Sequence, residues 1–509
     1  MRSKKALKNM IFSIIHQIVN IVCGFIVPKL IISHFGSSIN GLTSSIAQFL
    51  GYITLLESGF GPVIKSTLYK PIAQKDKKQI ANILKTSEQF FKRIAYIFLI
   101  YIIILFFAYP TIINNEFSFI FTASLILIIS VSTFAEYFFG ITYRLFINAN
   151  QENYVVSIIR ILTRIANTVM IIILVRYYHS IHLIKLLSAT IFVLRPIAQN
   201  IYVKRKYKID LSIADKDYKI PNKWDGLAQH IAAVIHSNTD ITVLTLLSNL
   251  LEVSVYSVYY LVVNGIKKII TALTGGIDAS FGDMIAKNEI KNLNIKFRYY
   301  ELFYYLIITI IYSCTFILIV PFIKIYMSGV TDVNYIRPLF AFLLVLAEFV
   351  CAIRQPYISI TYAAGKFKET MKGAWVEAIL NIVISVCLVF KFGLIGVAIG
   401  TLVAMLIRTI EFILYSSKNI LHRSVFEVIK RNIIMASALL ITYLFGSIFL
   451  KYYEINNYFN FIIAGLVIVS IAFVISIILN YIFYKQDFGG IKIMLKRITK
   501  GKSKVSEEV

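Results

Sequence analysis

Long apolar segments recur along the whole chain and are separated by short polar connections. Each segment is close to the ~20 residues with which an α-helix crosses about 30 Å of hydrocarbon. The segments do not alternate between apolar and polar residues, as the strands of a membrane β-barrel would. The pattern therefore predicts an all-α polytopic membrane protein. Its spans, about fourteen in number, are expected near residues 10–33, 40–68, 88–109, 118–146, 154–177, 181–203, 226–249, 253–285, 298–327, 336–362, 370–391, 394–417, 430–450 and 458–484.

The charged residues lie mainly between these spans, and their sign alternates from one side to the other. The chain is 58% hydrophobic and 15% charged, with a formal net charge of +26. The N-terminus, the segment around Lys75, the stretch VKRKYKID and the C-terminal tail are basic, whereas the loops SHFGSSIN and SGVTDVNY contain no Lys or Arg. Because Lys and Arg are retained on the cytoplasmic side, both termini are predicted to be cytoplasmic. The positive charge thus reflects topology in a lipid bilayer, and no nucleic-acid partner is expected.

The chain also resembles itself at a spacing of about 212 to 215 residues. AEYFFGI, from Ala135, corresponds to AEFVCAI, from Ala347, and Gly61 falls on Gly275. This repeat predicts two pseudo-symmetric six-helix lobes of the same orientation. The lobes would occupy residues 1–208 and 225–420, joined by a cytoplasmic linker at 209–224. Residues 421–509 would add two further spans and the basic tail.

The second and eighth predicted spans contain residues that weaken a helix. Gly59, Gly61 and Pro62 lie in the second span, and Gly275 and Gly276 lie in the eighth. These residues would let both helices bend as hinges. The alternative is that Gly and Pro are simply tolerated in membrane helices.

The segment GLTSSIAQFLGYITLLESGFGPVIKSTLYKPIAQKDKKQI (Gly41–Ile80) resembles the second-span signature of the polysaccharide transporter family. NTDITVLTLLSNLLEVSVYSVYYLVVNGIKKII (Asn238–Ile270) resembles the seventh-to-eighth-span region of the same family. This family belongs to the multidrug/oligosaccharidyl-lipid/polysaccharide (MOP) exporter superfamily. The resemblance extends over the whole chain in span count and repeat order.

The resemblance implies a flippase of the bacterial cytoplasmic (inner) membrane. Its substrate would be an O-antigen, capsular or exopolysaccharide repeat unit on undecaprenyl diphosphate, moved to the outer leaflet by alternating access. The implied fold is a V of two six-helix lobes, like that of multidrug and toxin extrusion (MATE) proteins, plus two C-terminal helices. A polysaccharide polymerase and other assembly proteins are the implied partners, and no cofactor is implied.

Basic residues inside predicted spans are the candidate substrate-binding residues, because a charge in hydrocarbon is costly and marks function by default. They are Arg160, Arg164, Arg195, Lys267 and Lys268. Arg164 lies roughly 15 Å from the cytoplasmic end of its helix, which is deep for snorkelling, whereas Arg160 could reach the headgroups. A planar guanidinium binds phosphate bidentately, which suits a diphosphate head.

For a second set of candidate binding residues, a structural role is as good an explanation as a role in ligand binding. Arg144 and Arg354 lie nearer the cytoplasmic ends of their spans and suit interfacial anchoring as well as ligand binding. Tyr256 and Tyr260 could stack on sugars or belong to the interfacial aromatic belt. Arg408 and Glu411 are three residues apart on one helix and are expected to form a local pair.

Acidic residues inside the spans are candidates for ion coupling, because burial raises the pKa of a carboxyl group. Asp240, Glu57 and Glu377 are the candidates, and a buried hydrogen bond or ion pair is the alternative role for Asp240. Glu57 or Glu377 could also pair with Arg164 across helices. Glu136 and Glu348 are further intramembrane acids. The histidines and the four cysteines have no metal-like spacing, so no metal is assigned.

Two other functions are compatible with a hydrophobic chain of this kind. A drug or organic-cation antiporter of the same superfamily would need an acidic or aromatic cavity. A membrane glycan polymerase or ligase would need catalytic residues, which such enzymes usually carry on a large external loop. The predicted external loops are short and none combines a nucleophile, a base and an acid, so the chain is not expected to be an enzyme.

Overall fold

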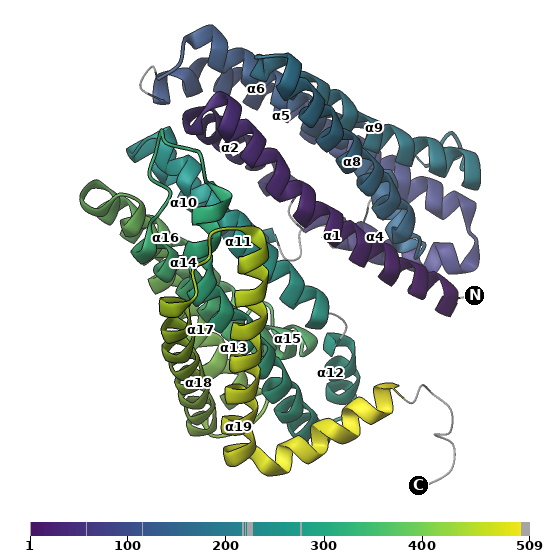
Figure 1. The fold of residues 1–509 in the computed structure, drawn as a ribbon. Coiled ribbons are helices and arrows are strands. Elements are labelled where there is room, and N and C mark those ends of the chain that lie inside the picture. The colour runs from purple at the N-terminus through teal and green to yellow at the C-terminus, as the bar shows by residue number, and fades with distance from the viewer. Residues whose placement is uncertain are drawn as a thin grey trace. The chain divides into compact units, whose positions relative to one another are not determined.

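Every regular element in the described part of the chain is a helix (Figure 1). The computed structural model describes residues 2–57, 59–113, 116–215, 218, 220, 227–274 and 277–499. By packing, the chain divides into two units. Unit 1 contains Met1–Leu261, Gly329–Val333 and Val386–Val397, and unit 2 contains Val262–Ser328, Asn334–Ser385 and Ala398–Val509.

Unit 1 is built from the first ten α-helices, one π-helix and the first part of α11. In this unit α1 packs along α8, α5 along α6, and α9 against both α6 and α8 (Figure 1). The helices are α1 (Arg2–Phe35), α2 (Ser37–Gly51), α3 (Thr54–Glu57), α4 (Phe60–Gln74), α5 (Lys77–Ile112), α6 (Phe119–Ala135), the π-helix η1 (Glu136–Gly140), α7 (Ile141–Ala149), α8 (Asn153–Tyr177), α9 (Ile181–Tyr207), α10 (Leu227–Leu247) and α11 (Leu250–Thr274).

Unit 2 centres on α13, which packs against α14, α18 and α19. It contains the last part of α11 and the helices α12 (Ile277–Ala286), α13 (Ile290–Tyr326), α14 (Pro338–Ile353), α15 (Gln355–Ala363), α16 (Met371–Phe392), α17 (Leu394–Asn419), α18 (Val425–Tyr452) and α19 (Tyr458–Thr499). The end of α16 and the start of α17, within Val386–Val397, belong to unit 1. The division by packing falls within α11, after Leu261, and not in the predicted linker at 209–224. The lobes predicted from the sequence repeat therefore have other boundaries than the two units defined by packing.

The described helices have the surface of a membrane protein. Eleven of them are long and apolar enough to cross a bilayer. Large apolar side chains such as Ile100, Phe107 and Leu466 are more than half exposed, as expected where lipid is the solvent. The chain is thus a multi-pass membrane protein. The helices at the second, seventh and eighth predicted spans are not among the eleven, so a count of fourteen stays a prediction.

The second span of the first repeat and the fourth span of both repeats are interrupted. The second span is divided into α2, α3 and α4, and Gly59 has φ +80° at the start of α4. This left-handed conformation is one that glycine adopts without strain. The fourth span changes to the π-helix η1 in unit 1, and its counterpart in unit 2 is divided at Arg354 between α14 and α15. In the eighth span the predicted hinge residues Gly275 and Gly276 stand between α11 and α12 in the sequence and lie outside the described residues.

Two connections that lack Lys and Arg meet in unit 1. The backbone amide of Ser37 donates to a carboxylate oxygen of Asp332 at 2.6 Å, and the Ser37 hydroxyl donates to the other oxygen at 2.8 Å. Ser37 follows the first span and Asp332 follows the ninth. Their contact places both connections on one side of the membrane, in agreement with the alternation of charge.

The last two helices are attached to unit 2 by buried charges. Glu301 on α13 accepts hydrogen bonds from Arg423 at 2.6 and 2.8 Å and forms an ion pair with Arg431 of α18 at 3.1 Å. Arg431 also contacts Asp487 of α19 at 3.0 Å. Removing one partner from such a buried network is strongly destabilising. We therefore expect α18 and α19 to move with α13 as one body.

Candidate functional site

Three arginines predicted from the sequence lie together in unit 1. Arg160 and Arg164 are one turn apart on α8, and Arg195 is on the neighbouring α9. Arg195 is close enough to Arg160 and Arg164 to interact electrostatically with both. The structure thus brings these residues into one cluster, which we call the arginine cluster.

Two members of the arginine cluster are held by neutral groups. Arg164 donates from Nη2 to the amide oxygen of Asn20 on α1 at 3.0 Å. Arg195 donates from Nε to the Thr163 hydroxyl at 2.7 Å, and its guanidinium lies 4.1 Å from the centre of the Phe192 ring. These hydrogen-bond partners orient the two guanidinium groups and carry no charge themselves. Arg195 also interacts electrostatically with Glu136. Glu57 and Glu377, the acids considered as partners of Arg164, bind other groups.

Arg144 joins the cluster together with two acids. It interacts electrostatically with Arg160, is hydrogen-bonded to Glu136 of η1, and lies 4.0 Å from Glu57 of α3. Tyr137 donates to the other oxygen of Glu57 at 3.1 Å. Among these residues four guanidinium groups face two carboxylates, so the site has a positive excess. Such an excess favours an anionic ligand.

The interruption of the fourth span positions this site. Helices with a π-turn often occur at functional sites because the extra residue re-aims the side chains around it. Here the π-helix contains Glu136, and its last residue, Gly140, packs tightly against α9. A Cβ atom on Gly140 would lie 2.5 Å from the Cβ of Pro196, the residue after Arg195. Glycine therefore permits the close approach of η1 to the helix that carries Arg195.

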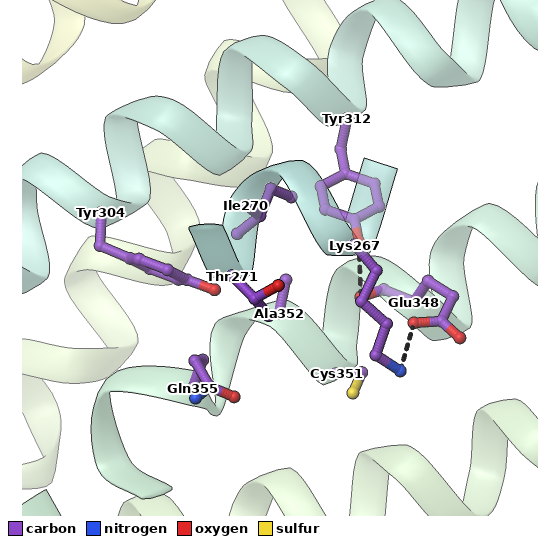
Figure 2. A pocket seen from close by; sticks show the side chains of 9 residues that line it. All are labelled: Lys267, Ile270, Thr271, Tyr304, Tyr312, Glu348, Cys351, Ala352 and Gln355. Atoms are coloured by element: carbon purple, nitrogen blue, oxygen red, sulfur yellow. Dashed lines mark hydrogen bonds and ion pairs between the residues drawn. The ribbon is translucent and has the colours of Figure 1, made fainter. Parts of the chain in front are cut away.

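Unit 2 contains a second charged site, a cavity of about 30 Å³ between α11, α13, α14 and α15 (Figure 2). This volume is enough for one or two ordered waters. Lys267 lies 3.1 Å from Glu348, and the Tyr312 hydroxyl donates to the backbone oxygen of Glu348 at 3.1 Å. The cavity is lined by Lys267, Ile270, Thr271, Tyr304, Tyr312, Glu348, Cys351, Ala352 and Gln355. Lys268 is exposed and is not part of this lining.

Other predicted candidates belong to buried networks. Arg354 contacts Glu377 at 2.6 Å, and Glu377 lies 3.7 Å from Arg408. The expected pair between Arg408 and Glu411 is confirmed, with a distance of 2.6 Å. These four groups link α14, α16 and α17 through alternating charges. Arg354 and Glu377 are nearly buried, which suits a structural role at least as well as a role in binding.

The tyrosines and the acid predicted near the seventh and eighth spans contact one another. Tyr256 is buried and donates to Asp240 at 2.8 Å. Tyr260 stacks on Tyr256 with ring centres 5.7 Å apart. Asp240 is itself buried, so the hydrogen bond considered as its alternative role is present.

Sequence reasoning assigned no site role to Glu136, Glu348, Asn20 or Thr163. A signal for the two glutamates was available, because the repeat aligns AEYFFGI with AEFVCAI and so aligns Glu136 with Glu348. No local signal marks Asn20 or Thr163. Their contacts with the arginines depend on how α1, α8 and α9 pack.

Comparison with known proteins identifies the fold. No family model and no curated protein sequence matches the chain. Among solved structures, the lipid II flippase MurJ in an inward closed conformation aligns with a TM-score of 0.67 and 16% identity, over 94% of this chain and 99% of that one. The fold is that of the MOP transporters. An inward-facing MATE family multidrug resistance transporter of the MOP superfamily aligns with a TM-score of 0.58 and 14% identity, over 78% of this chain and 94% of that one.

A third MOP transporter, from Pyrococcus furiosus, aligns with a TM-score of 0.53 and 13% identity. The alignment covers 83% of this chain and 96% of that one. The MOP fold thus extends over most of this chain and nearly all of each neighbour. Since a fold hosts several functions, the substrate must be argued from the site.

Proposed function

We propose that this protein is a flippase for a lipid-linked oligosaccharide. The cargo would be a glycan repeat unit on undecaprenyl diphosphate, carried from the cytoplasmic to the outer leaflet of a bacterial inner membrane by alternating access. Both termini would be cytoplasmic, and residues 1–208 and 225–420 would be the alternating lobes. The similarity to the fold of MurJ, a lipid II flippase, supports this class of cargo.

The observation that carries the proposal is the positive excess of the arginine cluster. A diphosphate that leaves water loses hydration, and unpaired anions in hydrocarbon are prohibitively costly. Arg164 and Arg195 are oriented by Asn20 and Thr163, which are neutral. The charge of Arg164 is therefore available to compensate phosphate, and Glu136 offsets only part of the charge of Arg195. Arg160 and Arg144 would add to the attraction, whereas the polyprenyl chain would remain in lipid.

An organic-cation antiporter of the same fold is the competing function. Its cargo would need anionic or aromatic groups that face the transport path. In unit 1, Glu57 and Glu136 lie beside Arg144, and Asp240 is bonded to Tyr256. A cation would also meet the repulsion of the arginine cluster, so the anionic cargo is favoured.

Glycan export in a strain that lacks this gene tests the proposal. Arg164→Ala and Arg195→Ala should each lower export at least tenfold, which corresponds to about 1.4 kcal/mol of lost interaction, while the proteins reach the membrane in normal amounts. Arg176→Ala is the matched control, because Arg176 is exposed at the end of the same helix as Arg164. Normal export by both site variants would remove the arginine cluster from the mechanism.

A further inference from the structure

The ion pair between Lys267 and Glu348 is asymmetric. The side chain of Lys267 is 41% exposed, whereas that of Glu348 is only 6% exposed. The ammonium group therefore reaches open space, and the carboxylate is enclosed by the protein. Because the cavity has room for only one or two waters, a larger ligand would contact Lys267 from its exposed side and would not reach Glu348.

Glu348 also has fewer hydrogen-bond and ion-pair partners than Glu301 and Glu377, two other buried acids of unit 2. Glu301 accepts hydrogen bonds from Arg423 and Tyr357, and Glu377 contacts both Arg354 and Arg408. By contrast, Oε2 of Glu348, the atom that faces Lys267, accepts no hydrogen bond from any described residue and has the 3.1 Å ion pair alone. Separation from Lys267 would leave this buried oxygen unsatisfied, which is costly, so only a ligand that binds Lys267 strongly can take the ammonium from it.

The internal repeat gives independent support. Glu136 is the counterpart of Glu348 in the first repeat, and it too is bonded to an intramembrane cation, Arg144. Each glutamate lies near an interruption of the fourth span of its repeat. Two copies of the unit thus provide a carboxylate at the same position beside an intramembrane cation.

We propose that Glu348 is the built-in counter-anion of Lys267: it neutralises the ammonium in the empty transporter and yields it to a phosphate group of the cargo. This inference rests on the proposed function and adds a subsite to it. Each phosphate of a diphosphate that links a prenol to a sugar has two non-bridging oxygens that can accept from a lysine ammonium. The ammonium of Lys267 would thus have an anionic partner in both the empty and the loaded transporter. That partner compensates for the hydration that the ammonium loses in the protein.

The exchange predicts that removal of the carboxylate strengthens anion binding. The experiment is a calorimetric titration of the purified full-length protein in detergent with farnesyl diphosphate, a short prenyl diphosphate without sugars. Glu348→Gln should bind it on the order of tenfold more tightly than the wild type, because a charged competitor for Lys267 has gone. Glu348→Asp, which moves the carboxylate away from Lys267, should show a smaller gain and replaces the glutamine variant if that one fails to fold.

Two controls separate this effect from a general loss of negative charge. Glu411→Gln removes a partly exposed acid that pairs with Arg408 outside the cavity, and its affinity should equal that of the wild type. In a Lys267→Gln background, Glu348→Gln should no longer raise the affinity, because the effect acts through Lys267.

The outcomes distinguish this inference from the proposed function. If the wild type binds farnesyl diphosphate and Glu348→Gln binds it equally or more weakly, the counter-anion role is wrong and the flippase proposal stands. If the wild type does not bind the diphosphate, the flippase proposal is contradicted as well.

Discussion

Arginines within the membrane spans of unit 1 are stabilised in two different ways. Arg144 lies next to carboxylates, Glu136 and Glu57, which offset its charge. Arg164 is bonded to a neutral amide, that of Asn20. The first arrangement resembles a structural ion pair, and the second keeps a cation available for a ligand. The choice of partner thus decides which arginines can bind an anion without first losing a carboxylate.

Substitution of Asn20 tests this distinction at a single position. Asn20→Asp would place a carboxylate about where the amide oxygen lies, 3.0 Å from Arg164, and should lower glycan export at least tenfold because it neutralises the guanidinium. Asn20→Ala removes only a hydrogen bond and should have the milder effect. Export measured in the deletion strain checks this order, and an Asn20→Asp variant as active as the wild type would contradict it.

Glu152, between α7 and α8, makes stability depend on pH. Burial by itself would raise its pKa, but hydrogen bonds from Lys206, Tyr207, Lys5 and Tyr202 lower the pKa to about 2. A carboxyl group whose pKa is lower in the folded state stabilises the fold above its unfolded pKa of about 4.3, and this contribution is lost as pH falls toward 2.

Glu152→Gln should therefore have a lower thermal midpoint than the wild type at pH 7. The difference should stay constant down to about pH 5 and narrow at pH 3.5, where the wild-type carboxylate begins to lose its advantage. Thermal unfolding of both purified proteins across this range measures it. A difference that does not change with pH would show that the Glu152 contacts do not depend on its charge.

Among the helices, the apolar segments of the sequence predict where a helix forms but not where a helix is interrupted. The first span, near 10–33, corresponds to α1, and the spans near 154–177 and 181–203 correspond to α8 and α9. The interruption of the second span was signalled by Gly59. The π-helix η1 had no such signal, because EYFFG contains no proline and its glycine is explained by contact with Pro196, a residue distant in sequence.

Gly140→Ala tests the close packing of η1 against α9. The added Cβ would lie 2.5 Å from the Cβ of Pro196, so the helices must separate and Arg195 must shift. Overpacking of this kind costs about 1–3 kcal/mol. We expect a lower thermal midpoint and reduced export. Gly265→Ala on α11 is the control, because its added Cβ meets no atom within 4 Å, and equal behaviour of the two variants would contradict the packing argument.

In the whole molecule, the charges predict the topology and the repeat predicts two six-helix lobes, whereas packing divides the chain within α11, after Leu261. The contact between Ser37 and Asp332 agrees with the alternation, because it joins two connections that lack Lys and Arg. The arginine cluster was predictable only as a set of separate residues. Its assembly requires α1, α8 and α9 to pack together, and Asn20 is 144 residues from Arg164.

Labelling of single cysteines tests the predicted orientation. In a background without the four native cysteines, Ser33→Cys should react with a membrane-impermeant maleimide added to intact cells, because Ser33 is exposed beside the first external loop. Lys75→Cys, exposed in a basic connection, should react only after the membrane is opened. If Lys75→Cys reacted in intact cells and Ser33→Cys only after the membrane was opened, the predicted topology and direction of transport would both be wrong.

We propose that intramembrane arginines carry the diphosphate of a glycan lipid across the bilayer. The most direct test is flipping of a fluorescent undecaprenyl-diphosphate-linked oligosaccharide in liposomes that contain the purified protein. The wild type and Arg176→Ala should move the lipid to the opposite leaflet at equal rates. Arg164→Lys should flip it more slowly, because lysine lacks the bidentate fork of arginine. The rate with Arg164→Ala should be no higher than in protein-free liposomes. Wild-type flipping by Arg164→Ala, or no flipping by the wild type, would contradict the account.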